Sequence, residues 1–525
     1  MIEGVRQMEI QLSTKQKKWF KKHKYKLGAV EIADHLEISV SEARDLLGIK
    51  EEMFVPQSYE VQILGVVLVM AFLVLSTSLG NAFVSDDIPA ILNNPQLGTW
   101  SLATHAILGF WANMVHFLIA NTFGVMPWAF RLANIVFHLV TSTLLFLIVR
   151  RSNPFRTAMM ACLFFIVAPP ILESVVWISG MPYALGGMLA MGSLYLHLDD
   201  KRTPLKNFTE IGLWTMTLMS NEKYVFLPLL LLWWDWYRGK LVTKRWLLIA
   251  WFGLALVRGL EMLSVLGERI EVLKIENYTT IGSWDNPISK FLITIGYYIW
   301  LYLWPAGLTL YHSELDLSLP NLLKYGSLTV IVGWCLMMVS KRNRDVWFWM
   351  VFSISSLLLL LLPIRVGSLV AERYAYLMFA GLAVILAICL DSLFSNKRWN
   401  KTLYVFVGVV VLAMSLRSLD RIRDWRTADT LWFSAEFISP SSSQNHNNLG
   451  DAYANQGNLV KSIEEFTKAI ELNPLYADAV HNRANSYLKL GDVEKAKQGF
   501  TEALRLNPKL WQSKAMLTEI EASGK

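Results

Sequence analysis

The chain has 525 residues, of which 54% are hydrophobic and 17% are charged, whereas ordinary soluble proteins carry about 25% charged residues. This composition excludes a disordered chain, a collagen-like chain and an ordinary cytosolic enzyme. The apolar residues form runs, such as residues 61–79 and 322–339, that are long enough to cross a hydrocarbon core of about 30 Å as helices. The sequence therefore predicts a polytopic, all-α membrane protein.

Basic residues gather before the first apolar run. Seven lysines lie between residues 15 and 26, and no acidic residue lies between residues 11 and 30. Such a segment indicates a cytoplasmic topology signal first and a nucleic-acid-binding arm second. Residues 29–47 also have the rhythm of a helix-turn-helix, with Ser39 as an N-cap. We expect residues 1–58 to form a small cytoplasmic helical segment, and we do not favour a nucleic-acid partner.

Eleven apolar segments are candidate membrane crossings: residues 61–80, 128–149, 156–170, 181–198, 208–220, 222–237, 246–266, 322–340, 346–362, 370–391 and 402–417. With the N-terminus inside, the five basic loop clusters all fall in cytoplasmic loops, as the positive-inside rule requires. Counting residues 292–304 as a twelfth crossing would place the cluster at Lys341 outside. We therefore interpret that stretch as re-entrant or interfacial. Residues 59–420 are expected to form the transmembrane domain of a multi-pass protein of the cell (inner) membrane.

The last hundred residues are polar and repeat with a period of 34. Tyr453, Gly457, Phe466, Ala469 and Pro474 recur as Tyr487, Gly491, Phe500, Ala503 and Pro508. This period and these residue types are typical of tetratricopeptide repeats, in which each unit is a helix–turn–helix. We expect residues 421–525 to form a short α-solenoid on the non-cytoplasmic side. It could serve as a structural cap or as a groove for a peptide or a partner protein.

Most of the informative charged residues fall in loops on the predicted non-cytoplasmic side: Asp86, Asp87, Glu173, Glu222, Lys223, His312, Glu314, Asp316, Arg365, Glu372 and Arg373. A transporter would place its charges at mid-bilayer in broken helices. Charges collected at one membrane face instead favour an enzyme that uses a lipid-linked substrate there. The spacing of His312, Glu314 and Asp316 is loose for a divalent ion, so a metal is possible in principle but is not favoured.

Five motifs in register resemble one family. They begin with Asp86-Asp87 and continue at residues 131–138, 173–180, 304–308 and 371–376. Followed by repeats, they resemble the transmembrane and tetratricopeptide-repeat-containing O-mannosyltransferases of the GT-C class of membrane glycosyltransferases. The resemblance implies a GT-C-like bundle of about eleven transmembrane helices. It also departs from the family pattern: the usual Lys-Glu pair appears as Asn221-Glu222-Lys223, and the repeat array is short.

The resemblance implies that Asp86 or Asp87 is the general base of an inverting transfer from a polyprenyl-phosphate sugar. Departure of a phosphate needs cationic stabilisation, for which Arg373, Arg365 and Lys223 are candidates. The other residues expected to bind substrate are Glu372, Tyr374, Glu222, Glu173 and Arg131.

Each assignment has a simpler alternative. The aspartate pair could be a solvated turn, Arg373 could pair with Glu372 or anchor at the headgroups, and Glu173 could cap a short helix. His138 is expected to be a buried, hydrogen-bonded histidine of the core.

The sequence thus predicts an integral-membrane glycosyltransferase that moves a sugar, possibly mannose, to a protein or glycan acceptor without a cofactor. One alternative is a non-enzymatic membrane scaffold whose repeats recruit partners. Another is a membrane-bound regulator that binds DNA through residues 1–58.

Overall fold

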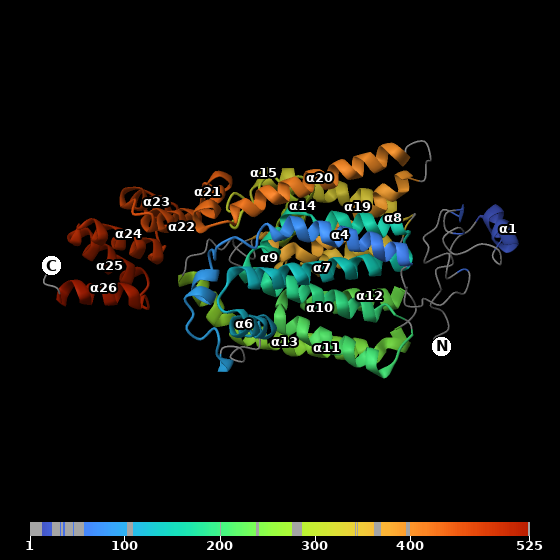
Figure 1. Cartoon of the computed structure of the whole chain (residues 1–525), viewed down its shortest axis with the longest axis horizontal. Coiled ribbons are helices and arrows are strands. Elements are labelled where there is room, and N and C mark those ends of the chain that lie inside the picture. The colour runs from blue at the N-terminus through green and yellow to red at the C-terminus, as the bar shows by residue number, and fades with distance from the viewer. Residues whose placement is uncertain are drawn as a thin grey trace.

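The structure is a computed structural model that describes residues 13–23, 57–101, 109–199, 201–237, 241–275, 286–341, 345–361, 369–394 and 400–522, with isolated positions at 32, 35, 36, 46 and 343. Every element within these ranges is helical, so the all-α prediction is confirmed. The helix-turn-helix expected at residues 29–47 lies largely outside the described residues. In Figure 1, α1 (Thr14–His23) lies beyond one end of a helix bundle and the C-terminal repeats lie beyond the other.

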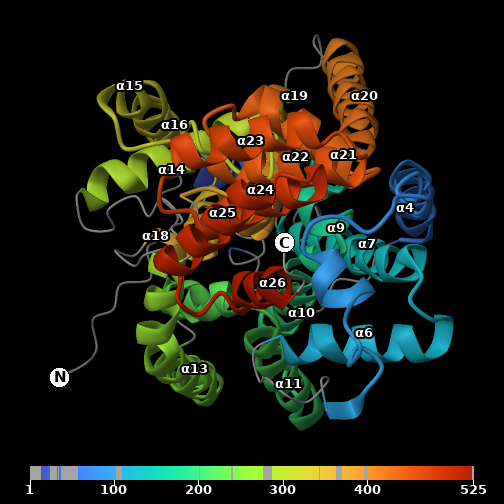
Figure 2. The same ribbon diagram turned by 90° about the vertical axis from the view of Figure 1, so that its left-hand side faces the viewer.

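Twelve longer helices of the described chain run through the bundle: α4 (Ser58–Ser76), α7 (Pro127–Ser152), α8 (Phe155–Ile166), α10 (Met181–His197), α11 (Pro204–Ser220), α12 (Leu227–Tyr237), α13 (Leu241–Ile275), α14 (Pro287–Leu303), α16 (Ser327–Ser340), α17 (Asp345–Ser355), α19 (Tyr376–Phe394) and α20 (Asn400–Asp424). The short helices among them are α9 (Leu172–Val175), α15 (Leu319–Asn321) and α18 (Leu358–Leu361). Helix α6 (Phe110–Phe123) lies across the repeat-bearing end, as Figure 2 shows.

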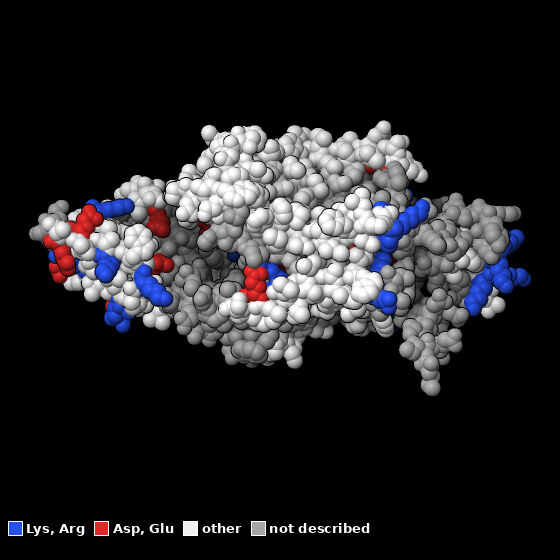
Figure 3. All heavy atoms as spheres, turned by 90° about the horizontal axis from the view of Figure 1, so that it is seen from below, with Lys and Arg blue, Asp and Glu red and all other residues white. Residues whose placement is uncertain are grey.

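Five segments of the described chain are long and apolar enough to cross a membrane: Ser58–Ser76, Pro127–Ser152, Lys244–Ser264, Leu319–Ser340 and Glu372–Ser392. A sixth is added if the bent pair Phe155–Ile166 and Pro169–Val175 counts as one crossing. These helices confirm a multi-pass membrane bundle, whereas the number of eleven crossings stays a prediction. On the face drawn in Figure 3, charged side chains gather towards both ends, and the surface between them is largely uncharged.

Polar contacts join the helix ends that carry the basic clusters. Arg150, at the end of α7, binds Glu60 at the start of α4 with its Nη2 2.9 Å from Oε1. Asn153 donates to Asp345 at the start of α17 over 2.9 Å, and Arg156 pairs with Asp391 near the end of α19. The predicted cytoplasmic loops therefore lie together at one end of the bundle.

Local sequence explains where several bundle helices begin. Helix α11 starts with Pro204, whose missing N–H is not needed in the first turn. The Thr203 side chain accepts a hydrogen bond from the Lys206 N–H, which is the usual role of an N-cap. Helix α14 starts in the same way with Asn286 and Pro287, and Pro305 follows shortly after its end.

Helix α14, which contains most of the stretch 292–304, packs closely against the Leu319–Ser340 segment. The Thr329 hydroxyl donates to the Leu292 carbonyl over 2.6 Å. A side chain at Gly296 would place its Cβ 1.9 Å from the Tyr325 carbonyl oxygen, so glycine is required there. Helix α14 has 17 residues and is not among the five candidate crossings. Its re-entrant or interfacial character stays a prediction.

The C-terminal helices form the predicted hairpins: α22 (Ser443–Asn455) with α23 (Leu459–Leu472), and α24 (Ala477–Leu490) with α25 (Val493–Leu506). Helices α21 (Ala428–Ile438) and α26 (Trp511–Ala522) flank them. The turns use Gly457 and Gly491, which have φ of 79° and 91°, values that glycine adopts without strain. The boundary predicted after residue 420 falls inside α20, since this helix continues to Asp424 and the solenoid begins with α21.

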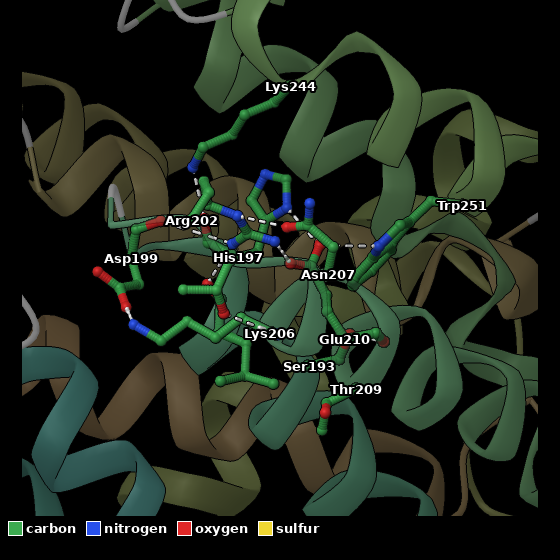
Figure 4. Close-up of polar contacts among 12 residues, drawn as sticks. Ser193, His197, Asp199, Arg202, Lys206, Asn207, Thr209, Glu210, Lys244 and Trp251 are labelled. Atoms are coloured by element: carbon green, nitrogen blue, oxygen red, sulfur yellow. Dashed lines mark hydrogen bonds and ion pairs between the residues drawn. The ribbon is translucent and has the colours of Figure 1, made fainter.

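A second polar network, which the sequence analysis missed, lies at the far end of α10 (Figure 4). The ring of His197 contacts Glu210 over 2.7 Å and Asp235 over 3.1 Å, and all three side chains are buried. Lys244 of α13 donates to the His197 carbonyl. The network ties α10, α11, α12 and α13 together.

The arrangement predicts which loops an impermeant thiol reagent reaches in intact cells. A cysteine replacing Lys341 should be protected, and one replacing Asn455 in the solenoid should react, because the chain enters and leaves the bundle at opposite ends (Figure 1). Both positions are exposed, so burial does not confound the comparison, and labelling after cell lysis gives the control. Reaction at 341 with protection at 455 would reverse the topology.

Candidate functional site

Arg131 organises the end of the bundle that carries the repeats. It lies on the first turns of α7, is fully buried, and donates to the carbonyl groups of Asn81, Ala82 and Val176. Two loops therefore converge on one guanidinium, whose fork of donors suits several acceptors at once. Arg131 was expected to bind substrate, but its donors are directed at the backbone.

Asp87 lies inside this arrangement and is also fully buried. Its Oδ1 accepts from the Ser179 N–H over 2.8 Å and from the Ser179 hydroxyl over 2.6 Å. Burial raises the pKa of Asp87 to about 6, although the Ser179 hydrogen bonds and the charge of Arg131 act in the opposite direction. Asp87 therefore connects the first long loop to the loop at residues 176–180.

Asp86, the preceding residue, is exposed. Ser85 before it has a φ of 52°, which is unusual for a residue other than glycine and costs conformational energy. The Ser85 hydroxyl lies 3.3 Å from Asp86 Oδ1. The backbone thus turns one carboxylate of the pair outward and the other inward, so the pair is not a simple solvated turn. Of the two predicted bases, Asp86 is exposed and Asp87 is buried.

Arg373 pairs with Glu173, and not with the adjacent Glu372 as one alternative had it. The Glu173 carboxylate, fully buried in α9, accepts from the Arg373 N–H over 2.8 Å and from the Arg373 guanidinium. It does not cap its own helix. The Arg373 side chain remains 16% exposed and lies 5.2 Å from the Trp177 ring and 4.9 Å from the Tyr374 ring.

Lys223 joins this group from another direction. It belongs to the 3₁₀ turn Glu222–Phe226, which Asn221 caps by accepting from the Lys223 N–H. Its ammonium lies 4.1 Å from the centre of the Tyr374 ring, within the range of a cation–π contact. Lys223 and Arg373 therefore both contact the ring of Tyr374. Glu222 is the neighbouring residue in that turn, and Arg365 lies outside the described residues.

Glu372 is buried behind Arg373. Its Oε1 accepts from the Thr309 N–H over 2.7 Å and lies 3.6 Å from His312 Nε2. The possible metal ligands at residues 312–316 diverge, because Glu314 accepts from Ser441 of the solenoid and Asp316 caps the turn at Ser318. Among the described residues, the group that could hold an ion is Glu436, His446 and Glu465 in the repeats.

The structure therefore brings together Asp86, Asp87, Arg131, Glu173, Lys223, Glu222, Glu372, Arg373 and Tyr374 at one end of the bundle. His138 bonds the Tyr376 hydroxyl and the Ile166 carbonyl, as expected of a core histidine. Sequence reasoning missed Ser179 as the partner of Asp87. The signal was present, since Ser179 belongs to the motif at residues 173–180.

Replacing Ser179 with alanine should raise the pKa of Asp87 above about 6, because the hydroxyl bond that favours the charged carboxylate is lost. A carboxyl group whose folded pKa exceeds its ordinary value of 3.8 destabilises the fold as it ionises. As the pH rises from about 4 to about 8, the melting temperature of the variant should therefore fall further than that of the wild type. Asp87→Asn, which cannot ionise, is the control. The same pH dependence in all three proteins would contradict this role.

Comparison with known proteins adds independent information. Models of the TPR repeat and the tetratricopeptide repeat match residues 450–491 and 477–510. Protein O-mannosyl-transferase TMTC3 of Mus musculus is 23% identical over 76% of this chain and 50% of that protein. A protein O-mannosyl-transferase of Caenorhabditis elegans is 23% identical over 76% of this chain and 61% of its own length.

A third relative, protein O-mannosyl-transferase Tmtc2 of Drosophila melanogaster, is 33% identical over 27% of this chain and 16% of its own. The chain spans about half the length of the curated relatives that it matches over most of its own length. It is therefore a homologue, over much of its length, of proteins named protein O-mannosyl-transferases, and it carries tetratricopeptide repeats near its C-terminus.

Proposed function

We propose that the chain is an integral-membrane glycosyltransferase. In this proposal it moves a sugar, mannose by analogy with the names of its relatives, from a polyprenyl-phosphate donor to a protein or glycan acceptor. The observation that carries the proposal is the division of the site into an outward carboxylate, Asp86, and a pair of cations, Arg373 and Lys223, on Tyr374. An inverting GT-C-type transfer needs both parts.

The proposed reaction is a single displacement. The acceptor hydroxyl oxygen forms a bond to the anomeric carbon of the sugar while the bond from that carbon to the phosphate oxygen breaks. The electron pair of the broken bond leaves with the polyprenyl phosphate, and Asp86 takes the hydroxyl proton. A positioned base of this kind contributes about 10²–10⁴-fold. Attack from the face opposite to the phosphate inverts the anomeric configuration.

Arg373 and Lys223 are assigned to the phosphate. The leaving group gains negative charge as the bond breaks, and fixed cations stabilise that charge without reorganising. Arg373 is held by Glu173 and by the flanking rings, so it is preorganised. Glu314 binds Ser441 of the solenoid, and Asp316 caps the turn at Ser318. No step of the proposed reaction needs a metal.

The proposed orientation places α1 in the cytoplasm and the candidate site and the solenoid outside it. The basic helix ends, which gather at the end of the bundle opposite to Asp86, support this orientation. In this proposal the reaction takes place at the surface of the cell (inner) membrane, and the apolar helices that can cross a membrane support it. The repeats would then offer an acceptor or a partner protein a surface on the same side as the base.

Asp86→Asn should lower sugar transfer at least about a hundredfold, because the variant keeps the shape of the side chain and loses the base. Protein level and melting temperature should be unchanged, since Asp86 is exposed. The assay is transfer of a labelled sugar from a polyprenyl phosphate by purified enzyme in lipid. Asp492→Asn in the repeats is a matched control, because Asp492 caps the start of α25 and asparagine caps a helix equally well.

Wild-type turnover by Asp86→Asn would remove the base from the mechanism. If cells carrying Asp86→Asn also behaved as the wild type, the non-enzymatic scaffold would become the better account of the repeats.

Arg373→Lys should weaken the apparent affinity for the polyprenyl-phosphate sugar by about tenfold, roughly 1.4 kcal/mol. Lysine keeps the charge but loses the fork that can hold Glu173 and the phosphate together. Acceptor affinity should change little, because the hydroxyl is bound on the Asp86 side. Donor and acceptor titrations on the same preparations separate the two effects. Equal donor affinity in both proteins would leave Arg373 as a structural anchor beside Glu173.

A further inference from the structure

The last turns of α20 and the two residues after it contact three of the loops at the candidate site. The hydrogen bonds run from Arg417 to the Pro305 carbonyl (2.9 Å), from Asn81 to the Ile422 carbonyl (3.1 Å), and from the Ala82 N–H to the Arg426 carbonyl (2.9 Å). The Trp425 ring lies 6.0 Å from the Trp177 ring. The segment that connects the bundle to the solenoid is therefore also part of the wall of the site.

Arg421 is the buried charge of this segment. Its side chain is 1% exposed, and its guanidinium donates to Asp424 over 3.0 Å and lies 5.5 Å from the Trp425 ring. Nη2 is 3.8 Å from Glu372 Oε1, which is an ion pair without a hydrogen bond. In the described part of the chain, Nε and Nη2 have no hydrogen-bond partner. Buried donors of this kind call for an explanation.

Within the ranges that the structure describes, Glu372 has an unpaired acceptor where Arg421 has unpaired donors. Its Oε2 is buried and has no hydrogen-bond partner among the described residues, and the same holds for His312 Nε2. Glu372 also lies close enough to Glu173 for the two carboxylates to repel each other when both are charged. Arg421 and Arg373 are thus the two arginines that balance two adjacent buried carboxylates, one arginine for each.

We propose that Arg421 is a positioning residue for the donor phosphate and acts through Glu372. This inference rests on the proposed function. With Arg421 in place, the negative charge of Glu372 is balanced by Arg421. Arg373 then balances the charge of Glu173 alone. Without Arg421, Glu372 becomes an uncompensated buried charge beside Arg373, and the positive potential offered to the phosphate falls. Arg421 itself stays buried and does not touch the substrate.

The test compares four purified full-length proteins in lipid: the wild type, Arg421→Gln, the double variant Glu372→Gln/Arg421→Gln, and Arg423→Gln. Arg423 is exposed on the same turn and is the matched control. The double variant removes both charges, yet glutamine keeps a carbonyl oxygen that can still accept the Thr309 N–H. Binding of polyprenyl phosphate, the KM for donor, the KM for acceptor and the melting temperature are measured for each.

Arg421→Gln should weaken polyprenyl phosphate binding and raise the donor KM about tenfold, with the acceptor KM within about twofold of the wild type. The double variant should recover donor binding to within about threefold of the wild type, and Arg423→Gln should match the wild type. The split between donor and acceptor KM distinguishes an effect on the phosphate site from simple unfolding, because unfolding would affect both substrates and lower the melting temperature. Recovery in the double variant then shows that the effect comes from the charge of Glu372.

Donor binding by Arg421→Gln equal to that of the wild type would overturn the inference and leave the proposed function standing. A double variant no better than Arg421→Gln would also overturn it. A wild type that neither binds polyprenyl phosphate nor transfers sugar would overturn the proposed function, and this inference with it.

Discussion

The buried guanidinium of Arg131 is the constraint on which the repeat-bearing end of the bundle depends. It binds the carbonyls of two separate loops, and Asp87, which is stabilised by its charge, binds a third point at Ser179. Hydrogen bonds to a charged group contribute about 1.5–3 kcal/mol each, and a buried cation left without partners is costly. The loops are therefore fixed relative to α7, which fixes the direction of Asp86.

The two carboxylates of the first loop illustrate how burial separates the roles of like residues. Asp87 has the raised pKa, yet it is enclosed and fully engaged. Asp86 is accessible, and the positive φ of Ser85 directs it outward. Backbone strain at a site persists only where the surroundings impose it, and here Arg131 and Ser179 impose it. A perturbed pKa alone would have selected Asp87, which is enclosed, in place of Asp86, which is exposed.

The sequence predicted the elements well because their signals are local. Apolar runs and a period of 34 can be recognised in the sequence without knowledge of tertiary contacts. The partners of the charged residues depend instead on tertiary packing: Glu173 and Arg373 are 200 residues apart, and Asp87 and Ser179 are 92 apart. The network around His197 was missed for the same reason, although charged residues within apolar helices such as Glu210 and Asp235 were a usable signal.

Polar contacts lie near both ends of α10. Helix α10 begins beside the loop that binds Asp87 and ends at His197, about 24 Å away at 1.5 Å per residue. Hydrogen bonds of the loop before it and the His197 network therefore hold its two ends, with apolar packing between them. The solenoid is attached to the first of these ends through Glu314 and Ser441 and through the stacked rings of Tyr311 and Trp432. The loop that carries Tyr311 also supplies the Thr309 N–H that binds Glu372. A protein bound to the repeats would therefore contact a domain that is attached to the same loop as the site residue Glu372.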